Sequence, residues 1–315
     1  MQDKYTTNQM ELHFAPLQGY TDHIYRRIHN ELYGGVYCYY TPFIRIEKGE
    51  PRHQDMNRLK QCAVDGTNLI PQIIFNSLQE FTSLVEAIKV MDYNRIDLNL
   101  GCPHPMQTGK GRGSALIANT ALMSDIADYI AKDTEVRYSV KMRLGMSQPD
   151  EWEAIMPILN SVSLEHVTLH PRVAKQMYNG DICYDQFKRF LDVSSNPVVY
   201  NGDIKSVNDL NQLSVRFPSV TKFMIGRGML ARPSLALEYK SGNEWSREQR
   251  ITSLLDFHDE LLDEYQTVLC GQAQVLQKIK PFWDYLESEI GHKVHKAIKK
   301  ATSLQKYKSA ISEIE

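Results

Sequence analysis

Arg95-Ile96-Asp97-Leu98-Asn99-Leu100-Gly101-Cys102-Pro103 is the stretch on which the interpretation of the whole sequence depends. Apolar and polar residues alternate from Ile96 to Leu100, as expected for a half-buried strand, and Gly101 ends it. Cys102 therefore follows a strand end, where parallel α/β proteins carry their catalytic loops. A lone cysteine is more often a small buried apolar residue, so the rest of the chain must decide between these two interpretations.

The pattern of a strand followed by a helix recurs on both sides of this stretch. After a short strand that begins at residue 12, we expect strands over 36–40, 69–75, 96–100, 138–142, 166–169, 197–200 and 222–225. Between them the apolar spacing predicts helices over 22–32, 77–91, 114–131, 151–162, 185–191, 206–215 and 230–239. Connections this short require parallel neighbouring strands, and eight strands connected in this way predict a closed (β/α)8 TIM barrel.

The chain changes character after residue 242. No strand signal remains, and apolar residues occur at helical spacing over about 251–262, 273–286 and 294–307. We therefore expect two domains, a barrel over 1–242 and a small helical bundle over 243–315. Six lysines and no acidic residue lie between Gly291 and Lys308. They fit either a solvated helix face or a surface for an anionic partner.

Composition excludes several classes of protein. The chain has 36 basic and 38 acidic side chains, 42% hydrophobic residues, and no apolar run long enough to span a membrane. Residues 1–8 lack the basic and apolar segments of a secretion signal, so we expect a cytoplasmic protein. The five cysteines are scattered and never spaced as Cys-x-x-Cys, which predicts neither a disulfide framework nor a metal site. We expect a monomer.

Polar residues recur where the predicted strands end, and these ends meet at one mouth of a barrel. Asn201-Gly202-Asp203 and Gly226-Arg227-Gly228 follow the seventh and eighth strands, where barrels commonly bind phosphate through backbone N–H groups. Arg227 adds a positive charge, so we expect a phosphate-bearing ligand. The other polar or loop residues at the predicted mouth are Pro16, Leu17, Gln18, Gln72, Asn99, Cys102, Lys141, Arg143, His170 and Arg172.

Lys141 lies in an otherwise apolar strand, between Val140 and Met142. A buried charge needs a partner to offset the loss of hydration. One interpretation is an ion pair that fills the barrel interior. We favour an anionic or electron-rich cofactor, because Arg143 and His170 are expected at the same mouth.

These motifs, in this order, resemble those of the tRNA-dihydrouridine synthases, flavin-dependent barrels that reduce a uridine of tRNA. The matching segments are Ala15-Pro16-Leu17-Gln18-Gly19-Tyr20-Thr21-Asp22, Asn99-Leu100-Gly101-Cys102-Pro103 with Gly109 to Gly113, Lys141-Met142-Arg143, His170-Pro171-Arg172 with Gln176 and Tyr178, Asn201-Gly202-Asp203-Ile204, and Gly226-Arg227-Gly228. Together they cover most of the chain.

The resemblance implies FMN at the barrel mouth, NADPH or NADH as reductant, hydride transfer to C6 of uracil, and protonation of C5 by Cys102. The residues implied around the flavin are Pro16, Leu17, Gln18, Gln72, Lys141, His170, Asn201, Gly202, Asp203, Gly226 and Arg227. Asn99, Arg143 and Arg172 would face the substrate. Lys296, Lys299 and Lys300 would contact tRNA phosphates, because a lysine-rich helix is suited to them.

The segment Lys280-Pro281-Phe282-Trp283-Asp284-Tyr285-Leu286 is most similar to the class C bacterial enzymes, which modify uridine 16 of the D-loop. Two other functions are compatible with parts of the sequence. An FMN barrel that reduces a free pyrimidine or another small enone would not need the lysine-rich appendage. A catalytically silent RNA-binding barrel would not need Cys102 and Lys141.

Overall fold

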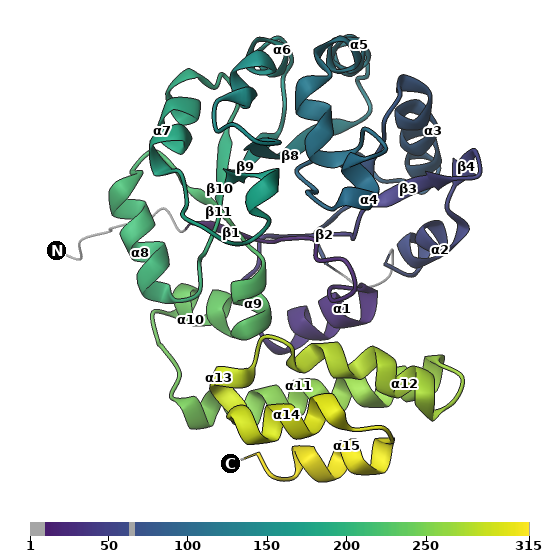
Figure 1. The fold of residues 1–315 in the computed structure, drawn as a ribbon, viewed down its shortest axis with the longest axis vertical. Coiled ribbons are helices and arrows are strands. Elements are labelled where there is room, and N and C mark those ends of the chain that lie inside the picture. Colours follow the sequence, from purple (N-terminus) through teal and green to yellow (C-terminus); the bar gives the residue numbers. More distant parts are fainter. Residues whose placement is uncertain (1–9, 63–66, 315) are drawn as a thin grey trace, which may run out of the picture.

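The computed structural model describes residues 10–62 and 67–314. It consists of a barrel of strands and helices, and a lobe of helices from the C-terminal quarter that packs against one side of the barrel (Figure 1). The first eight residues, which suggested the absence of a secretion signal, lie outside the described residues. No helix in the described part is long and apolar enough to cross a membrane.

Eight parallel strand positions close the barrel within the described residues, which confirms the predicted fold class. One of the predicted strands, over 69–75, is divided at Pro71 because proline has no N–H for the ladder. Its first half, β5, pairs with β2 and its second half, β6, pairs with β7. The barrel strands are β1 (Glu11–Phe14), β2 (Cys38–Tyr40), β5 (Leu69–Ile70) with β6 (Gln72–Ile74), β7 (Arg95–Leu100), β8 (Arg137–Gly145), β9 (His166–Val173), β10 (Val198–Asn201) and β11 (Lys222–Ile225).

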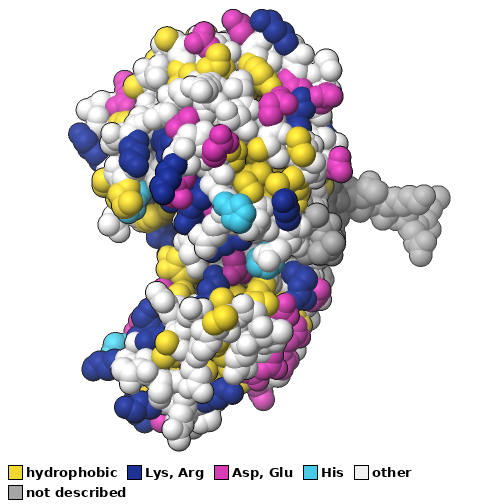
Figure 2. All heavy atoms as spheres, turned by 90° about the vertical axis from the view of Figure 1, so that its right-hand side faces the viewer, with side chains coloured by type: hydrophobic (Ala, Val, Ile, Leu, Met, Phe, Trp, Pro, Cys, Tyr) yellow, Lys and Arg dark blue, Asp and Glu magenta, His cyan; other side chains and the backbone are white. Residues whose placement is uncertain are grey.

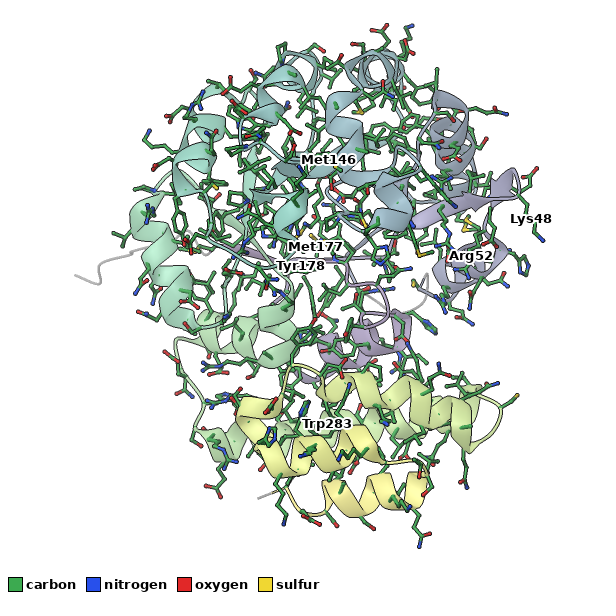
Figure 3. The ribbon with its side chains drawn as sticks, viewed as in Figure 1. Lys48, Arg52, Met146, Met177, Tyr178 and Trp283 are labelled. Atoms are coloured by element: carbon green, nitrogen blue, oxygen red, sulfur yellow. The ribbon has the colours of Figure 1, made fainter. Side chains whose placement is uncertain are left out.

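An insertion between the second and third barrel strands was not predicted. It contains the hairpin of β3 (Ile44–Glu47) and β4 (Glu50–Pro51), followed by helix α2 (His53–Cys62). The hairpin turns at Lys48 and Gly49, both with positive φ, and Lys48 lies at its tip in Figure 3. β4 has only two residues, too few to alternate, whereas β3 does alternate from Ile44 to Glu47 and could have been recognised.

The helices around the barrel are more broken than the sequence predicts. The segment predicted as a helix over 114–131 is a 3-10 turn, η1 (Gly113–Ala118), followed by α5 (Thr120–Ile130), whose first turn is capped by Asn119. The helix predicted over 230–239 is divided at Pro233. The remaining elements are α1 (His23–Leu32), α3 (Leu78–Lys89), α4 (Pro105–Thr108), η2 (Glu151–Ala154), α6 (Met156–Asn160), η3 (Ala174–Gln176), α7 (Tyr184–Val193), α8 (Val207–Arg216), α9 (Arg227–Ala231) and α10 (Leu235–Ser241).

The helical lobe begins with the long helix α11 (Arg247–Val268). Trp283 lies at the centre of the lobe (Figure 3). It is fully buried, and its indole N–H donates to the Tyr307 hydroxyl at 2.8 Å. Two predicted helices are again divided, one at Pro281 and the other where Ser303 caps a new helix. The other elements of the lobe are α12 (Gln272–Ile279), η4 (Lys280–Trp283), α13 (Glu287–Ile290), α14 (His292–Lys300) and α15 (Leu304–Ile311).

The lobe is held against the barrel by contacts with the first βα unit. Asp22 caps α1 and also accepts from the Tyr265 hydroxyl at 3.0 Å and from Lys278 at 2.5 Å. The rings of Tyr25 and Phe257 pack between α1 and α11 with their centroids 4.9 Å apart. These contacts fix where the lobe lies relative to the barrel.

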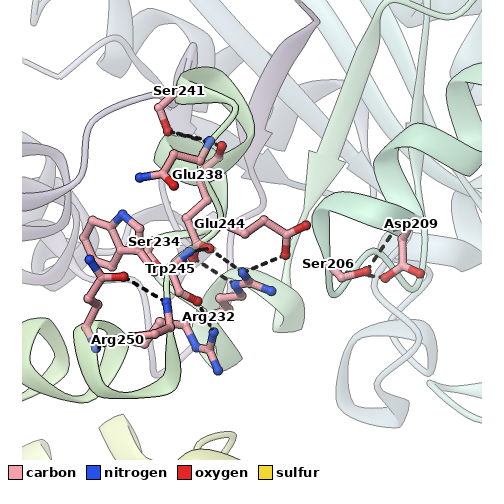
Figure 4. Close-up of polar contacts among 12 residues, drawn as sticks. Ser206, Asp209, Arg232, Ser234, Glu238, Ser241, Glu244, Trp245 and Arg250 are labelled. Carbon is pink, nitrogen blue, oxygen red and sulfur yellow. Dashed lines mark hydrogen bonds and ion pairs between the residues drawn. The ribbon is translucent and has the colours of Figure 1, made fainter.

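A second polar anchor lies where the chain leaves the barrel for the lobe (Figure 4). The Glu238 carboxylate is fully buried and forms a two-point ion pair with Arg232. It also accepts from the Ser234 hydroxyl at 2.5 Å and from the backbone N–H of Trp245 at 2.7 Å. The anchor spans the predicted domain boundary at residue 242, which itself stays a prediction.

His29 gives the fold a pH dependence that can be measured. It is fully buried, with Nε2 3.0 Å from the Pro233 carbonyl and Nδ1 2.8 Å from the Tyr39 hydroxyl. Burial lowers the pKa of His29 to about 3, so the folded protein keeps it neutral. Below pH 6.5 the unfolded chain binds a proton that the folded one does not. Because of His29, the free energy of unfolding therefore decreases by about 1.4 kcal/mol for each unit that the pH falls between about 6 and 4.

As the pH falls, the free energy of unfolding of His29→Gln should decrease less steeply than that of the wild type, by about 1.4 kcal/mol for each pH unit. The two proteins share every other titrating group, so the difference belongs to His29. Urea unfolding at pH 7, 6 and 5 measures the slopes. The exposed His53→Gln is the matched control for the substitution. Parallel slopes for His29→Gln and wild type would contradict a neutral, buried His29.

Candidate active site

A cavity of about 350 Å³ opens at the carboxyl ends of the barrel strands. It lies within the size range of small-molecule and cofactor sites. The structure brings fourteen of the predicted residues to its wall: Pro16, Leu17, Gln18, Gln72, Asn99, Cys102, Lys141, Arg143, His170, Asn201, Gly202, Asp203, Gly226 and Arg227. Arg172, Lys296, Lys299 and Lys300 do not line it.

The Cys102 loop is held firmly on both sides. The side-chain oxygen of Asn99 accepts from the backbone N–H groups of Gly101 at 3.1 Å and Cys102 at 2.8 Å. Gly113 passes so close that a Cβ there would lie 2.6 Å from the Cys102 carbonyl oxygen, which explains why glycine is required. Burial raises the pKa of the Cys102 thiol, so the group keeps its proton at neutral pH. A protonated thiol at the wall of a cavity can serve as a proton donor.

Lys141 projects from β8 to the cavity wall, and its Nζ donates to Oδ1 of Asn201 at 2.8 Å. Asn201 is itself oriented because its amide donates to the Met224 carbonyl at 2.8 Å. Burial and, after it, the nearby charge of Arg143 together lower the pKa of Lys141 to about 8. No carboxylate lies within ion-pair distance of Lys141 in the described residues, so an interior ion pair is not the explanation for this cation.

Arg143 and Arg227 flank the ring of Tyr178 at the rim of the cavity. Their guanidinium carbons lie 5.3 and 4.7 Å from the ring centroid, within the range of cation–π contacts. Tyr178 is 45% exposed and follows Met177, which has the strained backbone angles φ 51° and ψ −102°. Figure 3 shows Met177 and Tyr178 side by side in front of the barrel strands. The rim therefore carries a partly exposed aromatic ring in contact with two cations.

Arg172 has a different position from the one the sequence suggests. It is buried within β9 rather than beyond the strand end, and it forms a two-point ion pair with Asp203 at 2.9 and 2.5 Å. Arg227 approaches the same carboxylate at 3.2 Å. Arg172 thus orients Asp203, which does line the cavity. His170, two residues earlier, lies at the wall, and burial holds its pKa well below the ordinary value.

The three lysines predicted to contact tRNA phosphates lie exposed on α14 of the helical lobe and do not line the cavity. Figure 2 shows this lobe with Lys and Arg side chains along one edge and Asp and Glu along the opposite edge. Lys296 and Lys300 are exposed on α14 and have no ion-pair partner among the described residues. Lys299 is engaged by Asp284, which also accepts from the Tyr20 hydroxyl.

Several residues of the wall were not predicted to have a role. Pro42 and Phe43 come from the loop before the unpredicted hairpin, and Tyr285 comes from the helical lobe. Tyr178 was noticed in the sequence only as part of a motif. Tyr285 carries the largest consequence, because it shows that the lobe contributes directly to the cavity. In the sequence, only the position of Tyr285 within the segment 280–286, next to Asp284, pointed to a role for this residue.

The sequence of the chain matches a family model described as dihydrouridine synthase over residues 13–313. The chain belongs to the dihydrouridine synthase family. Dihydrouridine is uridine with its C5=C6 bond reduced, so this dihydrouridine synthase is an oxidoreductase. The interpretation of the sequence as a barrel enzyme that reduces uridine to dihydrouridine is confirmed.

Individual relatives agree with the family. The chain is 27% identical over 258 residues to "Probable tRNA-dihydrouridine synthase 2" of Bacillus subtilis, which covers 80% of this chain and 78% of the relative. It is 27% identical over 226 residues to "tRNA-dihydrouridine synthase B" of Pasteurella multocida, covering 70% of this chain and 66% of the relative. Class C membership stays a prediction.

Solved structures share the fold of this dihydrouridine synthase at low sequence identity. A 2-naphthoyl-CoA reductase superposes with a TM-score of 0.54 at 11% identity, over 74% of this chain and 50% of that one. The old yellow enzyme from Trypanosoma cruzi superposes with a TM-score of 0.53 at 8% identity, over 75% of this chain and 89% of that one. These similarities support the barrel architecture alone.

Proposed function

We propose that this dihydrouridine synthase reduces a D-loop uridine of tRNA, with FMN in the cavity at the barrel mouth and NADPH as reductant. The observation that carries the proposal is the pairing of chemistries on one cavity wall. Lys141 is a half-buried cation without an ion-paired carboxylate among the described residues, and Cys102 is a thiol that burial keeps protonated. An electron-rich ring that accepts and passes on hydride explains the first, and a double bond that must be protonated explains the second.

The residues present suit FMN. Lys141 would face the part of the ring that gains negative charge on reduction, and Gln72 and His170 offer further polar contacts at the wall. The glycine-containing loops at Gly202 and Gly226, with Arg227 beside them, would hold the phosphate. FMN bound by these residues would supply hydride for C6 of the uracil.

The chain itself would provide the proton and the orientation of the base. Cys102 would donate its proton to C5, and Asn99 holds the Cys102 loop at the cavity. Arg143 lines the cavity and would contact the base, while Arg172 would act through Asp203 rather than on the base directly. Tyr178 is partly exposed at the rim and would contact a base turned out of the tRNA, together with the two arginines over its ring.

An absorption spectrum tests the proposal directly. The purified protein, reconstituted with FMN where necessary, should show flavin bands that NADPH bleaches in air-free buffer. Unmodified tRNA should restore them, and mapping dihydrouridine in the product should place it in the D-loop. A protein that binds no FMN, or whose bleached bands tRNA does not restore, would overturn the proposal.

The lysines of the lobe should carry part of the tRNA affinity. Lys296 and Lys300 are the best placed, because Lys299 is already paired with Asp284. Reversing Lys296 and Lys300 to Glu should weaken tRNA binding about tenfold or more, because each reversal replaces a favourable phosphate contact with repulsion. The salt dependence of binding should become shallower by about one unit for each lost phosphate contact.

Titrations at several salt concentrations measure both effects. Lys188→Glu is the control, because Lys188 is exposed on α7 of the barrel. If the double reversal and the control bind tRNA equally well, the lysine-rich edge of the lobe is only a solvated surface.

A further inference from the structure

A row of polar side chains crosses the barrel interior and ends at the Cys102 loop. It forms because the strands place Gln72 opposite Asp97, and Asp97 opposite Ser139. The Asp97 carboxylate accepts from the Ser139 hydroxyl at 2.6 Å and from Nε2 of Gln72 at 2.7 Å. Oε1 of Gln72 in turn accepts from Nδ2 of Asn99 at 2.8 Å. Asp97 is fully buried and does not line the cavity.

The direction of these hydrogen bonds is set at both ends of the row. At one end the backbone N–H groups of Gly101 and Cys102 can only donate, so Asn99 must turn its oxygen toward them. At the other end an ionised Asp97 can only accept, so Gln72 must turn its nitrogen toward it. The two requirements agree, which leaves one orientation for both amides.

The Asp97 carboxylate is suited to this task at neutral pH. Burial raises its pKa to about 6, while the bonds from Gln72 and Ser139 favour the charged form. Near pH 7.5 the carboxylate is therefore ionised and presents acceptors only.

We propose that Asp97 is a positioning residue that fixes which way the Gln72 and Asn99 amides face, and thereby holds Cys102 at the cavity for proton transfer. The role of Cys102 rests on the function proposed above. Without an acceptor at position 97, Nε2 of Gln72 loses its partner in the barrel interior, and an unpaired buried donor is costly. The Gln72 side chain therefore moves away from Asn99, whose Nδ2 loses its acceptor in turn, and Asn99 is no longer fixed against the Cys102 N–H.

Three variants separate the effect of hydrogen-bond direction along the row from the effect of the negative charge on Asp97. Asp97→Ala removes the acceptor. Asp97→Asn keeps an oxygen for Gln72, because the new amide nitrogen can donate to the Ser139 hydroxyl. Ser139→Ala removes the other bond to Asp97 and leaves the rest of the row intact. Each protein is prepared with its flavin bound.

The readout is the rate of each half of the reaction, measured separately at pH 7.5. Asp97→Ala should slow reoxidation of the flavin by tRNA about 100-fold, the cost expected for a misplaced reacting group, and leave bleaching by NADPH within about threefold. Asp97→Asn and Ser139→Ala should stay within about fivefold of wild type in both halves. Wild-type rates in Asp97→Ala, or an equal loss in Asp97→Asn, would overturn the proposal.

A measurement without tRNA keeps this inference separate from the proposed function. The rate at which iodoacetamide labels Cys102, followed by mass spectrometry of its peptide, reports the position of the thiol. Labelling should differ from wild type by about threefold or more in Asp97→Ala and return to the wild-type rate in Asp97→Asn. An unchanged rate in Asp97→Ala would overturn the inference, whereas a wild type that cannot reduce tRNA would overturn the function alone.

Asp97→Ser is the second variant if Asp97→Ala does not fold or loses its flavin. A serine hydroxyl has one oxygen on a shorter side chain where the carboxylate has two, so it cannot keep the bonds to both Gln72 and Ser139 in place. It should slow reoxidation by tRNA about tenfold or more. A wild-type rate in this variant would overturn the proposal.

Discussion

Cys102→Ala should bind FMN and be bleached by NADPH like the wild type, yet lose about 10²- to 10⁴-fold in the rate of uridine reduction. The physical reason is that alanine has no proton to give to C5, while it leaves the flavin wall of the cavity untouched. Because the Cys102 loop is held through its backbone by Asn99, removal of the thiol should not displace it.

Single-turnover reoxidation of the bleached flavin by unmodified tRNA measures this loss. Cys270→Ala is the matched control, because Cys270 is exposed and lies in the helical lobe. Equal turnover by Cys102→Ala and the control would remove Cys102 from the mechanism. A variant that loses its flavin would instead assign the thiol a structural role.

The second large effect concerns stability. Glu238→Ala should lower the free energy of unfolding by about 3–5 kcal/mol, because it leaves Arg232 partly buried without its main partner. Burial alone would raise the pKa of Glu238, but Arg232, Ser234 and the Trp245 amide together hold it below its ordinary value. The carboxylate is therefore charged in the folded protein.

Urea unfolding at pH 7 measures the difference. Glu244→Ala provides the comparison, since Glu244 contacts the same Arg232 but is exposed (Figure 4), and should cost less than about 1 kcal/mol. Similar losses in the two variants would show that burial of the Glu238 pair contributes nothing. Because the anchor joins α10 to the start of the lobe, Glu238→Ala should also weaken tRNA reduction at temperatures where the barrel stays folded.

The cavity could be predicted well because its residues follow strand ends. Asn99, Cys102, Asn201 and Arg227 each come directly after or at the end of a strand with a recognisable pattern, and a parallel barrel brings such positions to one mouth. The order of these residues along the chain, and the family resemblance that this order carries, can be recognised without any knowledge of tertiary contacts.

The helix boundaries were predicted less well, because helical periodicity does not show where a short turn interrupts it. Proline marks two of the breaks, at Pro233 and Pro281, and capping side chains mark two others, at Asn119 and Ser303. The β3–β4 hairpin escaped because β4 has only two residues, so the alternation from Ile44 to Glu47 had no recognisable partner strand in the sequence.

The sequence by itself determined the class of fold, the family and the set of side chains that meet at the mouth, because these depend on local periodicity and on the order of motifs. Only the tertiary structure decided which side chains pair. The register between strands places Asp97 beside Gln72 and turns Arg172 toward Asp203, and the docking of the lobe brings Tyr285 to the cavity. Contacts of this kind join residues far apart in the chain, so no local pattern specifies them.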